Sequence, residues 1–246
     1  MAQPIITTNK LSVETNGFTR LRATTLEIPA GLTCITGVSG SGKSTLLKAL
    51  VGITTPSQGE VHHRNLAGEA VYTNSPASGR QLKQRTVGWL LLDNSRQRTD
   101  AGYRSRYLGY IPQKPHIPNG LTAEEYLVKP HLARGNIVDL ELKNRITDTL
   151  GITELLGKQA VALSGGEQQR VTTAFALIHE PRIVFADEPT AALDSFNSKT
   201  TMTLLKELSE TAGMSVVCVT HSTEALKFAD TQIHLADNRV SEIRSL

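Results

Sequence analysis

The chain has 246 residues, of which 39% are hydrophobic and 20% charged, and its formal net charge is +3, as is ordinary for a globular domain with a sizeable core. This small positive charge gives no reason to predict nucleic-acid binding. No apolar run approaches the roughly 20 residues that a membrane-spanning helix needs, and the first residues lack the charged start and apolar core of a signal peptide. We therefore expect a cytosolic chain that needs a separate partner for any role at a membrane.

The first third of the chain predicts strands and one short helix. Two strands are expected between residues 11 and 37, separated by a turn at residues 29–31. A helix is expected from Lys43 to Gly52, and the following turn runs into a strand over residues 54–63.

Residues 62–106 show no clear periodicity. From Arg80 to Arg106 the stretch holds seven basic and two acidic residues. A solvated surface is the ordinary explanation of such a run, and a contact with anionic lipid or with an acidic partner is the alternative.

The second half of the chain alternates strands and helices. Ser164 and Glu167 form the capping box S-x-x-E, so a helix is expected to start there and to run over residues 164–180 before Pro181. Thr122 and Glu125 give the same signal for mostly helical residues 122–157. The other expected elements are a strand ending at Pro112-Gln113, strands over 182–187 and 214–221, helices over 195–213 and 222–229, and a hairpin turning at Asp237-Asn238.

The strands expected in the core are continuously apolar rather than alternating. This pattern favours an α/β fold with a mostly parallel sheet that is covered on both faces. Cys34 and Cys218 both lie inside such strands. We expect them to be buried, inert thiols, because no spacing supports a redox or metal role.

GVSGSGKST, residues 37–45, fits the phosphate-binding pattern G-x-x-x-x-G-K-[ST] between an expected strand and an expected helix. Glycines let backbone amides wrap phosphate oxygens without Cβ collisions, Lys43 would reach the β- and γ-phosphates, and Ser44 would coordinate Mg²⁺. A structural glycine-rich turn is the alternative. The predicted nucleotide-binding residues of this loop are Gly37, Ser39, Gly40, Ser41, Gly42, Lys43, Ser44 and Thr45.

RIVFADEPT, residues 182–190, delivers Asp187 and Glu188 to the carboxyl end of an apolar strand, where ligands of open α/β sheets bind. Asp187 is expected to hold Mg²⁺, and Glu188 to orient or deprotonate an attacking water. Two carboxylates that merely cap the next segment are the alternative. Together with the phosphate loop, the motif predicts a P-loop nucleoside triphosphatase.

LSGGEQQR, residues 163–170, puts a glycine pair at the start of a helix, whose free amides would face a gap that suits a phosphate. With all these motifs in one order, the chain resembles the ATP-binding cassette family, the ATPase subunits of ABC transporters, over nearly its whole length. Taken singly, each residue below has an ordinary structural explanation. By the resemblance, Gln113 is the family's Q-loop residue, Ser164, Gly165, Gly166 and Glu167 are its signature, Asp194 is its D-loop residue, and His221 is its switch histidine.

The resemblance also implies an architecture and a chemistry. It implies one ATPase domain over residues 1–246, with a RecA-like P-loop core at about 1–114 and 166–246, an N-terminal antiparallel β subdomain, and an α-helical subdomain at about 115–165. ATP and Mg²⁺ would be held between two identical cassettes paired head to tail, with Ser164 and Gly166 acting in trans. The implied catalytic residues are Glu188, His221 and Gln113, and the implied metal-binding residues are Ser44, Gln113 and Asp187.

The partners follow from the same resemblance. The helical subdomain would receive a multi-spanning permease subunit at the cytoplasmic side of the cell membrane, and no nucleic acid is expected. RYLGYIPQKPHIPNGLTAEEYL and DEPTAALDS are most similar to the macrolide-efflux and lipoprotein-release branch, which implies efflux of a hydrophobic or lipid-like cargo. The alternatives are the ATPase of an amino-acid-type importer and a soluble cassette protein acting on ribosomes or DNA.

Two features depart from the family pattern. The family stacks adenine on an early aromatic residue, but residues 13–15 hold none, and Phe18 is the nearby candidate, with local packing as its alternative. The stretch between Gly59 and Gln113 is also longer than we expect for compact members.

Overall fold

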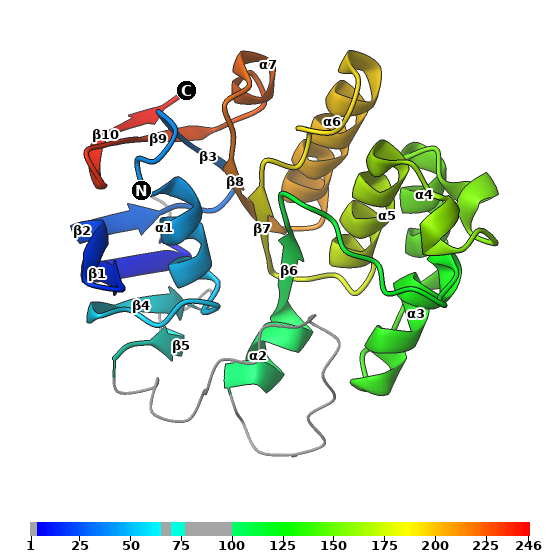
Figure 1. The fold of residues 1–246 in the computed structure, drawn as a ribbon, viewed down its shortest axis with the longest axis horizontal. Helices are drawn as coiled ribbons and strands as arrows, with labels where there is room; N and C mark the ends of the chain where they lie inside the picture. The colour runs from blue at the N-terminus through cyan, green and yellow to red at the C-terminus, as the bar shows by residue number, and fades with distance from the viewer. Residues whose placement is uncertain (1–3, 65–69, 77–99) are drawn as a thin grey trace. The chain divides into compact units, whose positions relative to one another are not determined.

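The computed structural model describes residues 4–64, 70–76 and 100–246. Most of the basic run that begins at Arg80 therefore lies outside the described residues, and its last part belongs to the helix α2 (Asp100–Tyr107). The chain forms two compact units, which Figure 1 shows as a ribbon. Unit 1 consists of residues 1–86 and 215–246, and unit 2 consists of residues 87–214.

Unit 1 contains an antiparallel sheet with the strand order β2-β1-β4-β5. In its first strand Ile6 and Thr8 are buried alternately, and after a register shift Leu11 and Val13 are, as expected where one face of a sheet covers a core. The predicted N-terminal antiparallel β subdomain is thus confirmed. The four strands are β1 (Ile6–Thr15), β2 (Phe18–Ile28), β4 (Gln58–Arg64) and β5 (Ala70–Asn74).

The other strands of unit 1 are mostly parallel. They lie in the order β10-β9-β3-β8, and β3 runs parallel to both of its neighbours. The helix α1 (Lys43–Leu50) packs on this set and on the antiparallel sheet of the same unit. The strands are β3 (Leu32–Gly37), β8 (Ser215–Val219), β9 (Thr231–Ala236) and β10 (Arg239–Ser245), and the short helix α7 (Thr223–Leu226) follows β8.

Two local predictions for unit 1 are confirmed. Asp237 and Asn238 join β9 to β10 with φ angles of 50° and 60°, as a two-residue hairpin turn of type I′ requires. Cys34 and Cys218 face each other in the pairing of β3 with β8, and both are fully buried free thiols.

Unit 2 has two parallel strands against which a helix packs closely. β6 (Leu108–Ile111) pairs with β7 (Ile183–Asp187), and every residue of β7 is buried. Gly109 in β6 lies directly against α5, because a Cβ atom on it would come within 2.3 Å of the Ala176 carbonyl oxygen. The longer helices of the unit are α3 (Ala123–Ala133), α4 (Leu140–Thr149), α5 (Gly165–Leu177) and α6 (Ser195–Thr211).

The starts of the helices in unit 2 follow the sequence signals more closely than their ends. Both predicted capping boxes are present, at the starts of α3 and α5. α5 ends at Leu177, three residues earlier than predicted, and Glu180 then takes a left-handed φ of 52° that no helix can continue. β5 and α2 were not predicted, because β5 is only five residues long and α2 lacks an apolar stripe.

Two histidines, the buried His131 and the half-buried His179, tie the helices of unit 2 to its strands. The imidazole rings of His131 in α3 and His179 after α5 are stacked with 4.5 Å between their centroids. The Nε2 atom of His131 donates to the Phe175 carbonyl at 3.0 Å, and that of His179 donates to the Leu108 carbonyl at 3.3 Å. Burial lowers the pKa of His131 to about 3 and that of His179 to about 4. The folded state therefore holds both rings neutral.

This histidine pair predicts a loss of stability in mild acid. An unfolded histidine has a pKa of about 6.5, so between pH 6.5 and 4 the unfolded chain binds protons that the folded chain excludes. The free energy of unfolding should therefore fall as the pH is lowered through this range, by at most about 1.4 kcal/mol per pH unit for each histidine. Urea unfolding at several pH values measures the slope.

The control is the variant His131→Phe, which keeps an aromatic ring at the stack and removes one titrating group. Its stability should fall less steeply with decreasing pH than that of the parent protein, whatever its absolute stability. Equal slopes for the two proteins between pH 6.5 and 5 would contradict the burial of a neutral imidazole.

Candidate functional site

The predicted phosphate loop connects β3 to α1 and needs its glycines for geometric reasons. Gly37, Gly40 and Gly42 have φ angles of 142°, 81° and 92°, which L side chains rarely adopt. A Cβ atom on Gly42 would also lie 2.7 Å from the Arg20 carbonyl oxygen, and one on Gly37 would lie 2.2 Å from that of Leu235. The loop thus needs glycine at these positions, as a cradle of backbone amides around a phosphate requires.

The start of α1 is built to meet an anion. In the part of the chain that the structure describes, no side chain caps this end of the helix, so the positive end of its dipole faces the loop. Lys43 is buried, and its Nζ atom donates to the carbonyl oxygens of Gly37 at 2.9 Å and Val38 at 2.8 Å. The Oγ atom of Ser41 is buried without a hydrogen-bond partner among the described residues. An ammonium group and an unsatisfied hydroxyl inside the loop fit the oxygens of a triphosphate.

The two carboxylates predicted at the end of β7 stand in different environments. Asp187 is the last residue of the strand and is only 3% exposed, whereas Glu188 is half-buried. Burial, and then the negative charge of Asp187, raises the pKa of the Tyr110 hydroxyl on the neighbouring strand β6. Glu188 has a φ of 52°, an uncommon conformation for a residue with a side chain. Such backbone strain is often found at functional residues.

Strand order places further predicted residues at the same sheet edges. In unit 1, His221 follows β8 and is exposed, and the phosphate loop follows the adjacent parallel strand β3. In unit 2, Gln113 follows β6 and is exposed, and Asp187 ends the adjacent parallel strand β7. Each unit thus carries its own group of predicted residues at the carboxyl ends of neighbouring strands.

The signature residues form an exposed helix start. The Ser164 Oγ atom accepts a hydrogen bond from the Glu167 amide at 3.3 Å, and a Glu167 Oε atom accepts one from the Ser164 amide at 2.7 Å. That second bond holds the pKa of Glu167 below its ordinary value. Ser164 and Gly165 are exposed, so this positive helix end faces outward.

Asp194 has an ordinary structural role, because it caps the start of α6. One of its carboxylate oxygens accepts from the Asn197 amide at 2.8 Å, and the other accepts from the Asn197 side chain at 2.6 Å. These bonds lower the pKa of Asp194 and start α6. A cap fixes the residue in place, and its D-loop role stays a prediction.

Phe18 does not pack into a core. Its side chain is 66% exposed at the start of β2, and the Arg20 guanidinium lies 5.7 Å from the centre of its ring. Sequence reasoning missed Arg20, although residues two apart on a strand share a face. The Phe18 ring thus contacts Arg20 rather than a core, and its contact with adenine stays a prediction.

Gln169 is a second residue that sequence reasoning missed. It lies in α5 next to the signature, is fully buried, and donates through Nε2 to the Pro112 carbonyl at 3.4 Å. The backbone immediately before Gln113 is thereby attached to the signature helix. A polar residue at a position expected on the buried face of a helix indicates a hydrogen-bond partner, and this pattern could have pointed to Gln169.

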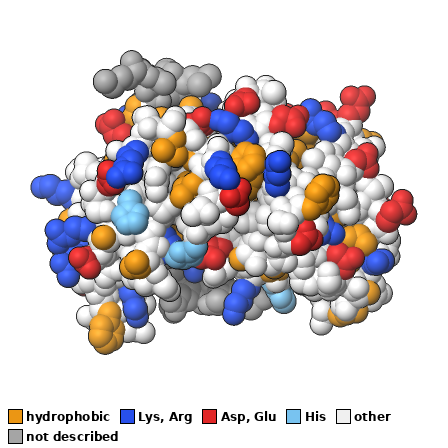
Figure 2. All heavy atoms as spheres, turned by 90° about the horizontal axis from the view of Figure 1, so that it is seen from above, with side chains coloured by type: hydrophobic (Ala, Val, Ile, Leu, Met, Phe, Trp, Pro, Cys, Tyr) orange, Lys and Arg blue, Asp and Glu red, His pale blue; other side chains and the backbone are white. Residues whose placement is uncertain are grey.

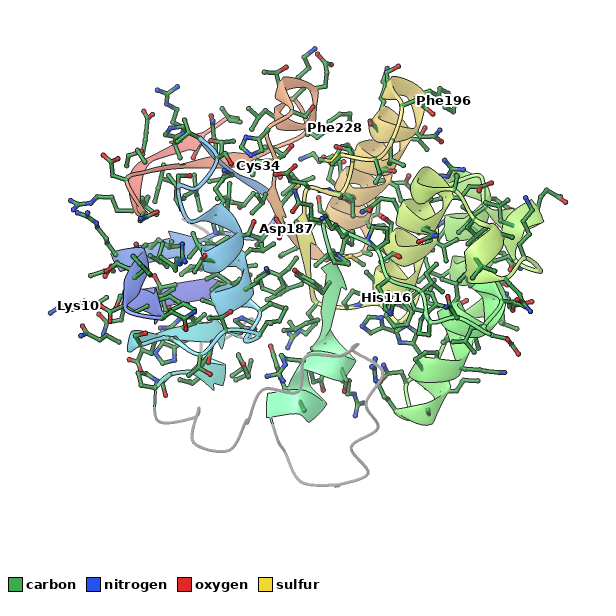
Figure 3. All side chains as sticks on the ribbon, viewed as in Figure 1. Lys10, Cys34, His116, Asp187, Phe196 and Phe228 are labelled. Atoms are coloured by element: carbon green, nitrogen blue, oxygen red, sulfur yellow. The ribbon has the colours of Figure 1, made fainter. Side chains whose placement is uncertain are left out.

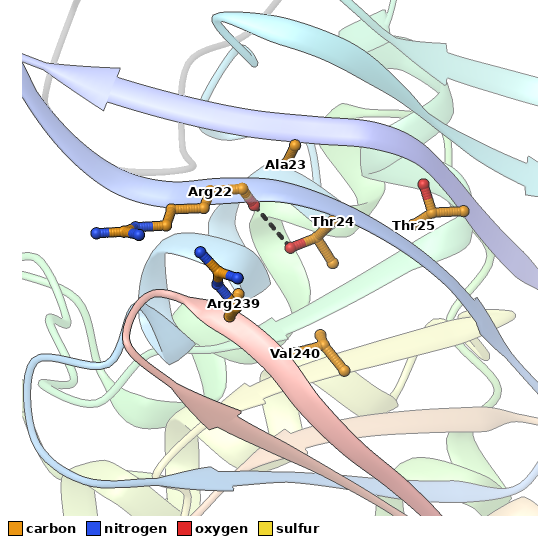
Figure 4. Close-up of a pocket in the computed structure, with 6 residues that line it drawn as sticks. All are labelled: Arg22, Ala23, Thr24, Thr25, Arg239 and Val240. Atoms are coloured by element: carbon orange, nitrogen blue, oxygen red, sulfur yellow. Dashed lines mark hydrogen bonds between the residues drawn. The ribbon is translucent and has the colours of Figure 1, made fainter.

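A separate cleft lies in unit 1 between β2 and β10 (Figure 4). Its volume is about 440 Å³, and none of the predicted site residues lines it. The lining residues of the cleft are Arg22, Ala23, Thr24, Thr25, Arg239 and Val240.

The donor set suits a hard cation held mainly by other ligands. Among the described residues, no group of three or more His, Cys, Asp or Glu side chains is placed to hold a metal ion. Mg²⁺ in nucleotide sites is bound by one or two protein oxygens, with phosphate oxygens and waters supplying the rest. The Ser44 hydroxyl and the Asp187 carboxylate have the chemistry for this. In the same described ranges, no helix has the length and apolar character to cross a bilayer.

Comparison with known proteins agrees with these features. A family model described as "ABC transporter" matches residues 21–191. The lipoprotein-releasing system ATP-binding protein LolD of Psychrobacter arcticus is 36% identical over 207 residues, which cover 82% of this chain and 80% of LolD. The macrolide export ATP-binding/permease protein MacB of Haemophilus ducreyi is 32% identical over 98% of this chain, which matches 32% of MacB.

A solved structure shows the same fold. It is a dimeric ATP-binding cassette in a post-hydrolysis state with ADP and Pi, with a TM-score of 0.77 and 27% identity, and the match covers 98% of each chain. The family model, the relatives, the shared fold and the glycine-lined phosphate loop all lead to one assignment. The chain belongs to the ABC transporter family, as an ATP-binding cassette ATPase that uses ATP and Mg²⁺.

Proposed function

We propose that two identical copies of this cassette pair head to tail at the cytoplasmic face of a membrane and drive a separate multi-spanning subunit that exports a hydrophobic or lipid-like cargo. The observation that carries the pairing is the exposed start of α5, where Ser164 and Gly165 present a positive helix end outward. A helix end of this kind is an anion site, and the γ-phosphate of ATP on a second copy is the anion that we assign to it.

Export is supported by the relatives. LolD is named for lipoprotein release and MacB for macrolide export, and this chain covers 80% of the first protein and 32% of the second. MacB is named as both ATP-binding protein and permease, and this supports a membrane permease as the partner in the proposal. The proposal includes a RecA-like core at about 1–114 and 166–246 and a helical subdomain at about 115–165, which would receive that partner.

The phosphate loop would hold the nucleotide through its backbone. Amides of residues 39–45 would surround the β- and γ-phosphates, and the Lys43 ammonium would move from the loop carbonyls to phosphate oxygens. Phe18, with Arg20 over its ring, would support the adenine. Ser44, Asp187 and Gln113 would hold Mg²⁺, which when bound neutralises charge on the phosphates.

Hydrolysis requires a base and an orienting group. Glu188 would take a proton from a water whose oxygen bonds to the γ-phosphorus while the bond to the bridging oxygen breaks. The left-handed backbone of Glu188 fixes the direction from which its carboxylate is presented. His221 would orient the γ-phosphate and the water, and Asp194 would contact the second copy. Loss of the γ-phosphate would then release the two copies.

The variant Glu188→Gln should bind ATP with unchanged affinity and lose at least about 100-fold in turnover, because an amide cannot accept the proton of the attacking water. Phosphate release and nucleotide binding measure the two effects. Glu180→Gln is the matched control, since Glu180 has the same φ of 52° and also precedes a proline. Equal turnover in the two variants would rule out Glu188 as the base.

The variant Lys43→Ala should weaken ATP binding by about 10- to 100-fold, because a charge-assisted contact to phosphate is lost. Calorimetric titration with Mg-ATP gives the dissociation constant, and thermal unfolding checks that the loop still folds. Lys48→Ala removes an exposed lysine from the last turn of the same helix and should leave the affinity unchanged. Normal affinity in Lys43→Ala would exclude the phosphate-cradle assignment.

The membrane partner is tested by purification of the tagged chain from detergent-solubilised membranes. We expect a multi-spanning protein to co-purify in a stoichiometric amount. The reading frame next to the one that encodes this chain should encode that protein. Recovery of the chain with ribosomes or DNA instead, and without a membrane protein, would contradict the transport role.

A further inference from the structure

The cleft between β2 and β10 in unit 1 carries two positively charged side chains that the proposed function does not use. Its volume is about 440 Å³, and Arg22 on β2 and Arg239 on β10 both line it. We call these two residues the cleft arginines. Figure 4 shows their guanidinium groups at the same end of the cleft. Lys and Arg side chains also gather at the left of the face shown in Figure 2, where Figure 1 places β2 and β10.

Neither cleft arginine is neutralised within the part of the chain that the structure describes. No ion pair or hydrogen bond there involves the guanidinium group of Arg22 or of Arg239. Asp237 in the turn before β10 is exposed and forms no ion pair among the described residues, and Glu242 is already paired with Arg244 at 2.6 Å. Two like charges at one end of a cleft repel each other, so an anion between them would be bound favourably.

The walls of the cleft are held by bonds that leave both guanidinium groups available. The Arg22 amide donates to the Asn238 carbonyl at 2.7 Å, which attaches β2 to the turn before β10. The Thr24 hydroxyl donates to the Arg22 carbonyl at 2.8 Å, and β10 is paired with β9. Because these strands are already fixed, a ligand would not have to order them when it binds.

The neighbouring lysine belongs to a different surface. The Lys10 amide donates to the Thr25 hydroxyl at 3.0 Å, but Lys10 lines a second cleft together with Gln58 and Gly59. Figure 3 shows the Lys10 side chain pointing outward from its sheet. Among the described residues, the cleft arginines are therefore the cationic side chains that line the cleft between β2 and β10.

Two arginines from two strands favour a phosphate group over a carboxylate. A guanidinium group binds either anion through two parallel N–H···O bonds, so one arginine is enough for the two oxygens of a carboxylate. A phosphate monoester has three terminal oxygens and can accept hydrogen bonds from both cleft arginines at once. Ala23 and Val240 line other parts of the cleft, and their small apolar side chains suit a short carbon skeleton rather than a second charged group.

We propose that this cleft is a second anion site, which binds a small phosphate monoester between the guanidinium groups of Arg22 and Arg239. The proposal goes beyond ATP hydrolysis and does not depend on the pairing of two copies. The volume of about 440 Å³ suits a small ligand, whereas a nucleic-acid strand would need a row of phosphate contacts. The same chemistry occurs in a soluble phosphate ester and in the headgroup of phosphatidic acid, so the test includes both sources.

The first measurement is calorimetric titration of the full chain with glycerol 3-phosphate in saturating Mg-ADP, which occupies the phosphate loop. Arg22→Gln and Arg239→Gln should each raise the dissociation constant of glycerol 3-phosphate at least about tenfold, because each removes a charge-assisted contact. The second measurement is flotation with phosphatidylcholine vesicles that do or do not contain phosphatidic acid. Binding to phosphatidic acid, where it occurs, should fall in the same two variants.

The matched control is Arg244→Gln, which removes the same charge from the same strand β10 at a residue that does not line the cleft. It should leave the binding of both probes unchanged, and thermal unfolding checks that every variant folds. Binding of glycerol 3-phosphate alone would assign a soluble ester, and binding of phosphatidic acid that both cleft variants lose would assign a lipid headgroup. If the parent bound neither probe, or if the control weakened binding as much as the cleft variants, the second anion site would be overturned and the proposed function left intact.

Discussion

Two helices in this chain start at or beside glycines, and the proposed chemistry depends on the partial positive charge of these two helix ends. At α1 the left-handed glycines of the phosphate loop keep side chains away from the helix end, and Lys43 adds a buried positive charge. At α5 the Glu167 carboxylate accepts a hydrogen bond from the Ser164 amide, and Ser164 and Gly165 remain exposed. Both ends suit an anion, and in the proposed pair one triphosphate held between two copies would satisfy both.

The buried parallel strands hold the predicted site residues in place. β3, β7 and β8 bury nearly all of their side chains, so their registers cannot slip without exposing apolar surface. The residues predicted to carry the chemistry lie where these strands end: the loop at Gly37, the carboxylates at Asp187 and Glu188, and His221. Rigid strands that end in chemically active residues explain how a strained φ of 52° at Glu188 is tolerated.

In unit 2 the signature, the segment after β7 and the start of α6 form one connected structure. Gly166 packs on the Ala192 carbonyl, Asp194 caps α6, and Gln169 holds the backbone before Gln113. A shift of α5 would therefore displace the segment after β7, the start of α6 and the backbone before Gln113, because packed elements move as units. This connection gives a physical route by which nucleotide between two copies could be coupled to a membrane partner.

The sequence by itself determined the phosphate loop, both capping boxes, the buried strands and the family, because these depend on local spacing and on residue type. It did not reveal β5 or α2, because β5 is only five residues long and α2 lacks an apolar stripe. Tertiary structure alone decided that Phe18 and Phe196 are exposed, that Asp194 is a helix cap, and that Arg20 and Gln169 lie beside the predicted residues. Exposure and contact are properties of packed surfaces, which no local pattern of residues specifies.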